Sequence, residues 1–341
     1  MFRQDRTNPS TAISNWRGRH DTLKGWPSTL VSSWLNGGLF GSAVAIPAGY
    51  FGGGYTYPPG VQVDTVDKFA FADDTRTTLA NGLSAIENLL AGWANSGVAG
   101  FFGGGGTTAA TTVNKFTFAG DVRSSLGTGL DEATWRAAAM ANSGTAGYFG
   151  GGYAGSGILS RVLKFAFSDD SRTTLGTGLS SAAYGLMAMA NSGTAGYFAL
   201  GYVSGSVATV DKYAFSDDSR STLGTGLSAG AHDGGAMANS GTAGYIALGY
   251  APTAVATIDK FAFSDDSRTT LGTGLSSSRA YLAGMANSGT AGYFGGGYTA
   301  AGAYATTVDK FAFSDDSRTT LGTGLSAGTN QLAAMANAGV L

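Results

Sequence analysis

The phrase MANSGTAGY occurs four times in this chain, beginning at residues 140, 189, 237 and 285. Related glycine-rich phrases at residues 48 and 99 extend the series to six copies. Counted from the Ala of each AGY or AGF, at residues 48, 99, 146, 195, 243 and 291, the spacings are 51, 47, 49, 48 and 48 residues. A nearly constant period of this length is typical of repeat proteins, in which copies of one small unit pack against each other. The chain therefore consists mainly of copies of one unit and not of several unrelated domains.

Each copy has the patterns of four short strands. A small-residue segment such as AAMANSG is followed by TAGYFGGG, which ends in glycines. VDKFAF and its relatives alternate apolar and polar residues with the period of a strand. The turn-forming group SDDS then precedes a threonine-rich fourth segment. The third segments begin at Val66, Val113, Val162, Val210, Ile258 and Val308.

Four strands in a unit of this length correspond to one propeller blade. The count predicts an all-β fold, a six-bladed β-propeller over residues 45–341, with residues 1–44 as an N-terminal extension. The first strand of the first copy is missing, but a matching phrase, MANAGVL, begins at residue 335. We therefore expect residues 332–338 to complete the first blade and close the ring, which removes exposed sheet edges. The small residues and occasional Met of these first strands are expected to line the crowded axis.

The order of these segments resembles the kelch repeat of galactose-oxidase-type β-propellers, in which the second strand ends in paired glycines. The resemblance covers residues 45–341 and implies a fold more than an activity. Two features depart from the kelch pattern. Leu175 and its equivalents stand where a kelch blade usually has Trp, and the first strands are poor in large side chains.

Alternate connections in such a blade lie on opposite faces of the disc. The turns NSGT and SDDS, expected on one face, hardly change between copies, whereas the loops and links expected on the other face vary in length and chemistry. Because loops on a rigid scaffold often carry binding sites, we expect the variable face to bind a glycan or a protein surface. Unconstrained drift of surface loops is the alternative. The candidate ligand-binding residues are Glu87, Asn88, Trp135, Arg136, Tyr184, His232, Asp233, Arg279, Tyr281, Asn330 and Gln331.

Residues 1–40 differ from the rest of the chain. They have five basic and two acidic residues and three of the five tryptophans, whereas the remainder has a net charge of -5. We expect an arm that docks on other proteins of an assembly and leaves the disc opposite the variable face. A strap packed on its own propeller is the alternative. The expected docking residues are Trp16, Arg17, Arg19, Trp26 and Trp34.

The sequence argues against several kinds of chemistry. The chain has no cysteine and only two histidines, which excludes thiolate and multi-histidine metal centres. The Asp pairs lack the supporting pattern of a calcium loop, so we expect turns there and no metal or other cofactor. Lys and Arg recur at fixed positions of every copy, and this predicts scaffold charges and not a nucleic-acid surface. A glycosidase using two of the following carboxylates stays open as an alternative: Asp64, Glu87, Asp131, Glu132 and Asp233.

The small-residue copies, the absence of cysteine and the docking arm together resemble a bacteriophage virion component, such as a tail, baseplate or capsid-decoration protein. The first residues, MFRQDRTNPS, lack the apolar run of a secretory signal, so we expect synthesis in the host cytoplasm and no membrane insertion. The expected role is non-enzymatic: a structural and recognition module that binds a cell-surface glycan or receptor. The alternatives are a carbohydrate-active enzyme and a free lectin-like adaptor, cytoplasmic or extracellular, that does not need the arm.

Overall fold

The computed structural model describes residues 47–106 and 110–338, and these residues form strands and no helix. The fold of this part is all-β, as the repeat pattern predicts. The five expected docking residues of the N-terminal arm lie outside the described residues.

Six four-stranded antiparallel sheets make up most of the described chain. The first two are β32 (Ala333–Ala336), β1 (Ala48–Gly52), β4 (Val66–Ala70) and β5 (Arg76–Thr78), then β6 (Ala91–Asn95), β7 (Ala99–Gly103), β8 (Val113–Thr117) and β9 (Val122–Ser125). The third and fourth are β11 (Ala138–Asn142), β12 (Ala146–Gly150), β15 (Val162–Ala166) and β16 (Arg172–Thr174), then β17 (Met187–Asn191), β18 (Ala195–Ala199), β19 (Val210–Ala214) and β20 (Arg220–Thr222). The last two are β21 (Gly235–Asn239), β22 (Ala243–Ala247), β23 (Ile258–Ala262) and β24 (Arg268–Thr270), then β26 (Ala283–Asn287), β27 (Ala291–Gly295), β29 (Val308–Ala312) and β30 (Arg318–Thr320).

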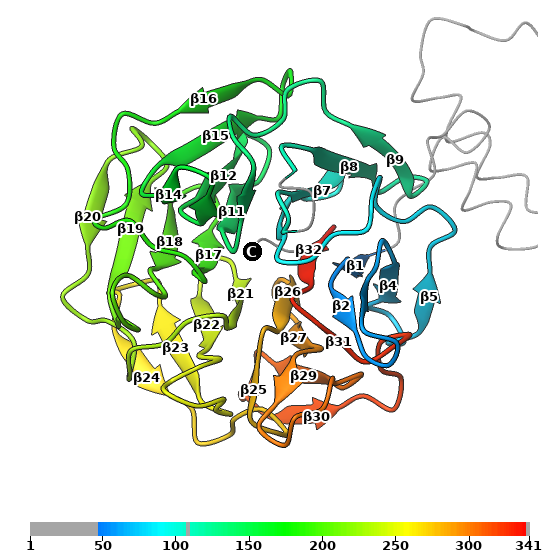
Figure 1. Cartoon of the computed structure of the whole chain (residues 1–341). Helices are drawn as coiled ribbons and strands as arrows, with labels where there is room; N and C mark the ends of the chain where they lie inside the picture. The colour runs from blue at the N-terminus through cyan, green and yellow to red at the C-terminus, as the bar shows by residue number, and fades with distance from the viewer. Residues whose placement is uncertain (1–46, 107–109, 339–341) are drawn as a thin grey trace, which may run out of the picture. The chain divides into compact units, whose positions relative to one another are not determined.

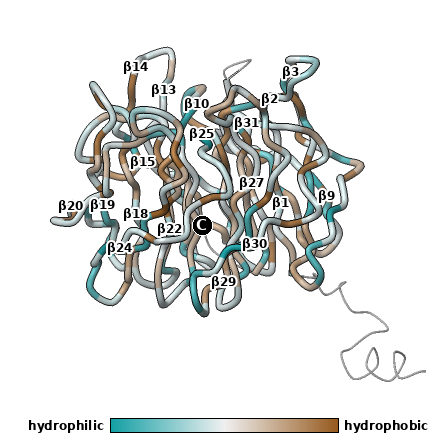
Figure 2. The backbone as a smooth tube through the Cα atoms, turned by 90° about the horizontal axis from the view of Figure 1, so that it is seen from below, coloured by the Kyte–Doolittle hydropathy of each residue, from teal (hydrophilic) through white to brown (hydrophobic). Residues whose placement is uncertain are grey.

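Short strands add three smaller sheets. These are β10 (Thr134–Trp135) with β13 (Tyr153–Ala154) and β14 (Gly157–Ile158), β2 (Tyr55–Thr56) with β3 (Val61–Gln62) and β31 (Thr329–Asn330), and β25 (Arg279–Ala280) with β28 (Tyr298–Thr299). Figure 2 shows these short strands gathered along one side of the sheets. We call this side, formed by the loops between second and third strands and by the links between sheets, the variable-loop face. The opposite side, formed by the NSGT-type and SDDS-type turns, is the constant-turn face.

The six sheets are arranged around a common axis, with the first strand of each sheet innermost (Figure 1). The first sheet combines segments from distant parts of the chain, because β32 pairs with β1 in the register Gly49 with Ala336 and Gly52 with Ala333. The predicted pairing of residues 332–338 with the strand that follows Pro47 is therefore confirmed.

The prediction that an occasional Met lines the axis holds for Met187, which lines an axial hollow, but is wrong for the Met of the MAN phrases. Met140 is fully buried between two sheets, and a Cβ on Gly196 of the next sheet would collide with its sulfur. The missing side chain of this glycine thus makes room for the neighbour's long, adaptable thioether. The same contact repeats around the axis: Met189 with Gly244, Met237 with Gly292, Met285 with Gly49, Met335 with Gly100, and Trp93 with Gly147.

The NSG turns are joined to each other by side-chain hydrogen bonds. Asn191 Oδ1 accepts from the backbone N–H of Gly241 at 2.8 Å, and the N–H of Ser192 donates to Ser240 Oγ at 3.0 Å. A turn that must supply these groups to its neighbour has little freedom to change its sequence. Equivalent bonds join Asn95 to Gly144, Asn142 to Gly193, Asn239 to Gly289, Ser96 to Ser143, Ser143 to Ser192, and Ser240 to Ser288.

The second Asp of each SDDS-type turn bridges to the preceding sheet. Asp266 accepts from Tyr197 Oη at 2.8 Å and from Lys212 Nζ at 2.6 Å. The repeated Lys is therefore a salt-bridged scaffold residue, as the sequence predicts. The other Lys–Asp pairs are Lys68–Asp121, Lys115–Asp170, Lys164–Asp218, Lys260–Asp316 and Lys310–Asp74.

The first Asp of these turns has a local role. Asp169 Oδ1 accepts from the N–H of Ser171 at 3.0 Å, the pattern of an Asx turn. The Ser171 hydrogen bonds hold the pKa of Asp169 below its ordinary value. Turn formation thus accounts for the Asp pairs.

Candidate functional site

One residue from each link between sheets meets its counterparts around the axis on the variable-loop face. The backbone N–H of each donates to the carbonyl of the one before, at 2.6 to 3.0 Å. Six such bonds form a complete cycle, since Leu89 at one end of the series donates to Gln331 at the other. We call this ring the central mouth; its members are Leu89, Arg136, Gly185, Asp233, Tyr281 and Gln331.

All six residues of the central mouth have a left-handed backbone. Their φ values lie between 53° and 65°, although only Gly185 is a glycine. This conformation costs an ordinary residue on the order of 1 kcal/mol, and such outliers concentrate at functional sites. The backbone bonds of the ring hold this geometry without using any side chain. The six side chains are consequently free to differ, and each is of a different chemical type.

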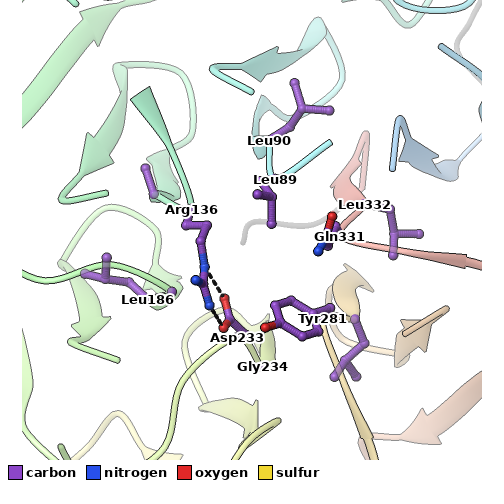
Figure 3. Close-up of a pocket in the computed structure, with 12 residues that line it drawn as sticks. Leu89, Leu90, Arg136, Leu186, Asp233, Gly234, Tyr281, Gln331 and Leu332 are labelled. Atoms are coloured by element: carbon purple, nitrogen blue, oxygen red, sulfur yellow. Dashed lines mark hydrogen bonds and ion pairs between the residues drawn. The ribbon is translucent and has the colours of Figure 1, made fainter. Parts of the chain in front are cut away.

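Arg136 and Asp233 form an ion pair in the central mouth (Figure 3). Arg136 Nε donates to Asp233 Oδ1 at 3.0 Å, and the Nη2 group donates to Oδ2. Arg136 lies in the link that leads into the third sheet, and Asp233 lies in the link that leads into the fifth. Gly185, in the link into the fourth sheet, lies between them. A Cβ at Gly185 would lie 2.8 Å from Asp233 Oδ1, so the glycine leaves room for the carboxylate. The ion pair therefore depends on three successive links, which supply an arginine, a glycine without a side chain and an aspartate.

Aromatic and amide groups flank this ion pair. The Arg136 guanidinium lies 4.6 Å from the ring centroid of Tyr184 and 5.7 Å from that of Tyr281. On the other side of the mouth, Asn88 Nδ2 donates to Gln331 Oε1 at 2.6 Å and fixes the orientation of that amide. Figure 3 shows Leu89, Tyr281, Gln331 and the ion pair around the same opening.

Burial and the ion pair set the protonation of these groups. Burial lowers the pKa of Arg136, but the Asp233 carboxylate outweighs this and raises it above its ordinary value. Burial and the Asp233 charge raise the pKa of Tyr281 to about 12, so its hydroxyl is a hydrogen-bond donor at neutral pH. Burial lowers the pKa of His232, so this imidazole is neutral there.

Two hollows lie on the axis. The hollow at the central mouth has a cavity volume of about 60 Å³ and is lined by the ring residues and by leucines such as Leu186 and Leu282. The second, of about 90 Å³, is lined mainly by alanine and glycine of the first strands. Small residues thus line the axis, as predicted, and the polar groups gather at its mouth on the variable-loop face.

An unbroken series of rings runs over this face from the third sheet's link to the sixth. Neighbouring ring centroids are 5.1 to 6.1 Å apart. Each ring is at least partly exposed, although aromatic side chains in this protein are mostly core residues. We call this series the aromatic arc; in order, it comprises Trp135, Tyr153, Tyr184, Tyr202, His232, Tyr250 and Tyr281.

A second ring cluster lies on the same face, around the smaller sheet of β2, β3 and β31. Tyr304 contacts Tyr55, Tyr57 and Tyr298 with centroid distances of 5.4 to 6.0 Å. The Tyr57 side chain is 63% exposed. The arc and this cluster leave the second sheet without an aromatic contribution in its described loop, where Gly106 occupies the position of the tyrosines.

The candidate ligand-binding residues divide into two groups. Arg136, Asp233, Tyr281 and Gln331 meet in the central mouth, and Trp135, Tyr184 and His232 belong to the aromatic arc. The others are buried. Arg279 is inaccessible to solvent, because its guanidinium binds Asp309 at 2.5 Å and the carbonyls of Gly296 and Thr307 at 3.0 Å, so it is a scaffold residue. Glu87, Asn88 and Asn330 are at most 7% exposed. Asn88 contributes to the site by orienting the Gln331 amide through their hydrogen bond.

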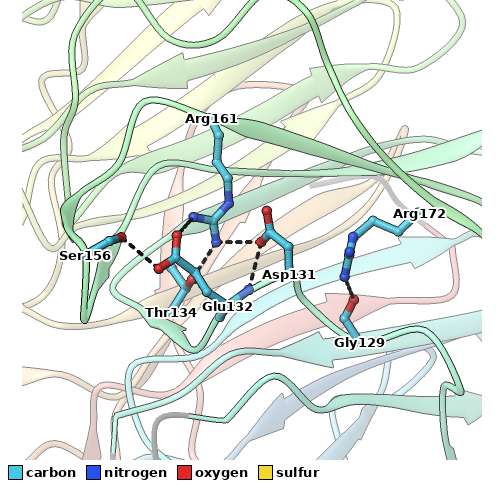
Figure 4. A network of polar contacts seen from close by, with 7 residues as sticks. All are labelled: Gly129, Asp131, Glu132, Thr134, Ser156, Arg161 and Arg172. Atoms are coloured by element: carbon cyan, nitrogen blue, oxygen red, sulfur yellow. Dashed lines mark hydrogen bonds and ion pairs between the residues drawn. The ribbon is translucent and has the colours of Figure 1, made fainter.

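Two carboxylates considered for catalysis are bound to one arginine (Figure 4). Arg161 Nη2 lies 2.8 Å from Asp131 Oδ1, and Arg161 Nη1 pairs with Glu132 Oε1. Glu132 in turn accepts from Ser156 Oγ at 2.7 Å, which ties the third sheet's long loop to the preceding link. This network fixes the loop that carries Tyr153. Asp233 is held by Arg136 in the central mouth.

Seven tyrosines of the two ring groups were missed in the sequence. Five of them end the phrases GGGY and ALGY, directly after glycines that close the second strand: Tyr55, Tyr153, Tyr202, Tyr250 and Tyr298. In the longer phrases AGYFGGGY and AGYFALGY, the first tyrosine is a core residue, and the last tyrosine looks like a repeat of it. The signal was present in the strand period, since the chain leaves the sheet at the glycines and the following side chain no longer follows the alternation.

Neither a scan against protein-family models nor a search of the curated proteins finds a match to this chain. The residues that the structure describes include no helix able to cross a membrane. Over the same residues, no group of three or more His, Asp or Glu side chains is placed to hold a metal ion.

Proposed function

We propose that the six sheets form a closed six-bladed β-propeller. Three kinds of contact support closure, because each returns from the sixth sheet to the first. Lys310 and Tyr293 bind Asp74, Met285 packs against Gly49, and the backbone ring of the central mouth is complete. Closure gives the variable-loop face a fixed shape on which side chains can be positioned.

We propose that this face is a non-catalytic recognition surface and that its ligand is a glycan. The aromatic arc is the observation that carries the proposal. A pyranose has an apolar face of C–H groups and a rim of hydroxyls, so it suits partly exposed rings next to fixed polar groups. The arc supplies the rings. Arg136, Gln331 and the Tyr281 hydroxyl supply hydrogen-bonding groups at its inner end.

The length of the arc favours an extended oligosaccharide over a single sugar. Seven rings in contact give several adjacent stacking positions, and the scaffold that carries them is rigid. Tyr and Trp lose little side-chain entropy on binding, which makes them efficient contact residues. A protein surface is the other ligand that such residues suit, and the test below separates the two.

We further propose that residues 1–40 anchor the propeller to a larger assembly, in keeping with a virion component of the tail, baseplate or capsid-decoration type. Composition supports this part of the proposal. The carbonyl of Pro47 accepts from the N–H of Phe71 at 2.9 Å, so the described chain enters β1 at the constant-turn face.

Glycan binding is tested with an array of oligosaccharides, followed by calorimetry on those that bind. Changing both Tyr202 and Tyr250 to Ala should reduce the affinity about fivefold or more per ring, since each lost stack removes about 1 kcal/mol or more. The double Phe variant is the matched control, because it keeps both rings. Both tyrosines are partly exposed, so circular dichroism should show an unchanged fold.

Undiminished binding by the double Ala variant would remove the arc from the proposal. Binding to a purified receptor protein with no signal on the glycan array would replace the glycan by a protein surface. Release of reducing sugar by the purified protein would favour the rival carbohydrate-active enzyme. A chain lacking residues 1–40 that still joins its assembly would favour the free adaptor.

A further inference from the structure

The central mouth is electrically compensated. Arg136 and Asp233 are its charged members, and they neutralise each other through two hydrogen bonds. The Asp233 side chain is only 5% exposed and the Arg136 side chain 21% exposed, so the arginine is the member that a ligand can reach. The carboxylate lies beneath as its counter-ion.

The guanidinium still offers donors to a ligand. Arg has more N–H groups than the two that this pair uses, and the ion pair and the neighbouring rings hold their plane fixed. Gln331 adds an amide whose orientation is set by Asn88, and Tyr281 adds a hydroxyl oxygen that can accept while its proton is directed to Asp233. These groups can bind two adjacent hydroxyls, while Leu89, the partly exposed leucine of the mouth, contacts a C–H face.

The neutralisation of Arg136 by Asp233 determines which charge of ligand the central mouth favours. A carboxylate-bearing sugar would compete with Asp233 for Arg136 and place two negative charges close together in a partly buried site, which is unfavourable. A neutral sugar meets no such repulsion and keeps the ion pair intact. The hollow of about 60 Å³ is too small to enclose a whole sugar ring, so it suits the hydroxyl-bearing edge of one ring.

We propose that the central mouth binds the terminal residue of a neutral glycan, a pyranose with adjacent hydroxyls, and selects against acidic sugars. The proposal rests on glycan binding by the aromatic arc. Tyr184 and Tyr281 belong to the arc and also flank Arg136, so an oligosaccharide on the arc would deliver its end to the mouth.

The experiment titrates the full chain with the methyl glycosides of glucose, galactose and mannose and with methyl glucuronide, using saturation-transfer NMR. We expect at least one neutral glycoside to bind at least tenfold more tightly than the glucuronide. Asp233→Asn keeps the shape of the side chain but leaves Arg136 uncompensated. It should therefore lower the affinity for the neutral glycoside about tenfold and raise the affinity for the glucuronide by a similar factor.

Asp315→Asn makes the same change in an exposed turn of the constant-turn face and should alter neither affinity. Gly185→Ala adds the one methyl group that would displace the Asp233 carboxylate, and it should reproduce the change in preference in part. A fold defect would lower both affinities together, whereas the proposal requires them to move in opposite directions.

Preference of the wild-type chain for the glucuronide would overturn the proposal, as would equal affinities of wild type and Asp233→Asn. If oligosaccharides bind, the arc variants lose them and the monosaccharide results are negative, the proposed function stands and the neutral-end site falls. If the wild-type chain binds no oligosaccharide on the array, both fall.

Discussion

Both faces of the array of six sheets carry hydrogen bonds from sheet to sheet around the axis, but they use different atoms. On the constant-turn face the acceptors are mostly side chains, such as Asn191 Oδ1 and Ser240 Oγ. On the variable-loop face the bonds of the central mouth join backbone to backbone. A side-chain acceptor fixes the residue type, whereas a backbone acceptor does not. The difference explains why one face repeats its sequence and the other does not, without any reference to function.

The difference bears on the choice between binding and drift. Constancy of one face would point to selection for binding on the other only if the constant turns were otherwise free to change. The constant turns, however, are held by their own structural bonds, so variation elsewhere does not by itself separate binding from drift. The stronger support for binding is the content of the variable-loop face: a continuous aromatic arc, and an ion pair that needs three links to cooperate.

The largest effect is expected at the shared acceptors of the constant-turn face. Asp266→Ala removes the partner of Tyr197 and Lys212 and places Ala at a φ of 57°. We expect a loss of about 2 to 3 kcal/mol in the free energy of unfolding, with allowance for the partial exposure of the pair. Denaturant unfolding measures it. Asp266→Asn tolerates the same backbone and should lose about half as much; a loss below about 0.5 kcal/mol for Ala would contradict the scaffold role.

A matched exchange tests the two faces directly. Asn191→Gln and Gln331→Asn alter one methylene in opposite directions, the first on the constant-turn face and the second in the central mouth. The first should destabilise by about 1 to 2 kcal/mol, because the longer side chain no longer places its buried amide oxygen on the Gly241 N–H. The second should cost less, about 0.5 to 1 kcal/mol, since the ring bond uses the backbone and Asn tolerates a positive φ, so that only the hydrogen bond from Asn88 Nδ2 is lost. Equal losses from both would break the comparison.

The smallest effect is a gain. The second sheet has Phe101 where the other five have the tyrosine that binds the bridging Asp, and Lys115 alone holds Asp170 there. Phe101→Tyr should add the missing hydrogen bond and raise the free energy of unfolding by about 0.5 to 1 kcal/mol. A thermal melt measures the shift. Tyr148→Phe, the reverse change in the third sheet, should lower stability by a comparable amount through its lost bond to Asp218.

The strand plan could be predicted from sequence because the repeat supplies six versions of each segment, and the junction of residues 332–338 with the first sheet follows from the missing strand. The direction of the Met side chains could not. Both sides of the first and second strands are buried, so alternation does not tell the axis from the gap between sheets.

The candidate site was only partly predictable for a similar reason. Variation between the copies pointed to the right links. It did not show that the exposed site residues lie two or three residues before each first strand, whereas neighbours such as Arg279 are buried. The Arg136–Asp233 contact joins residues 97 positions apart in the chain. It depends on the ring geometry and on the absent side chain of Gly185, which no local pattern encodes.

The pairing of β32 with β1 has a consequence for how the protein is made. A ribosome synthesises β1 long before β32, so the nascent chain carries the unpaired edge of Ala48–Gly52 through most of translation. An incomplete product ending before residue 333 would keep that edge open. Two such nascent chains on one message could exchange their late strands and form linked dimers, a hazard that rises with the rate of initiation.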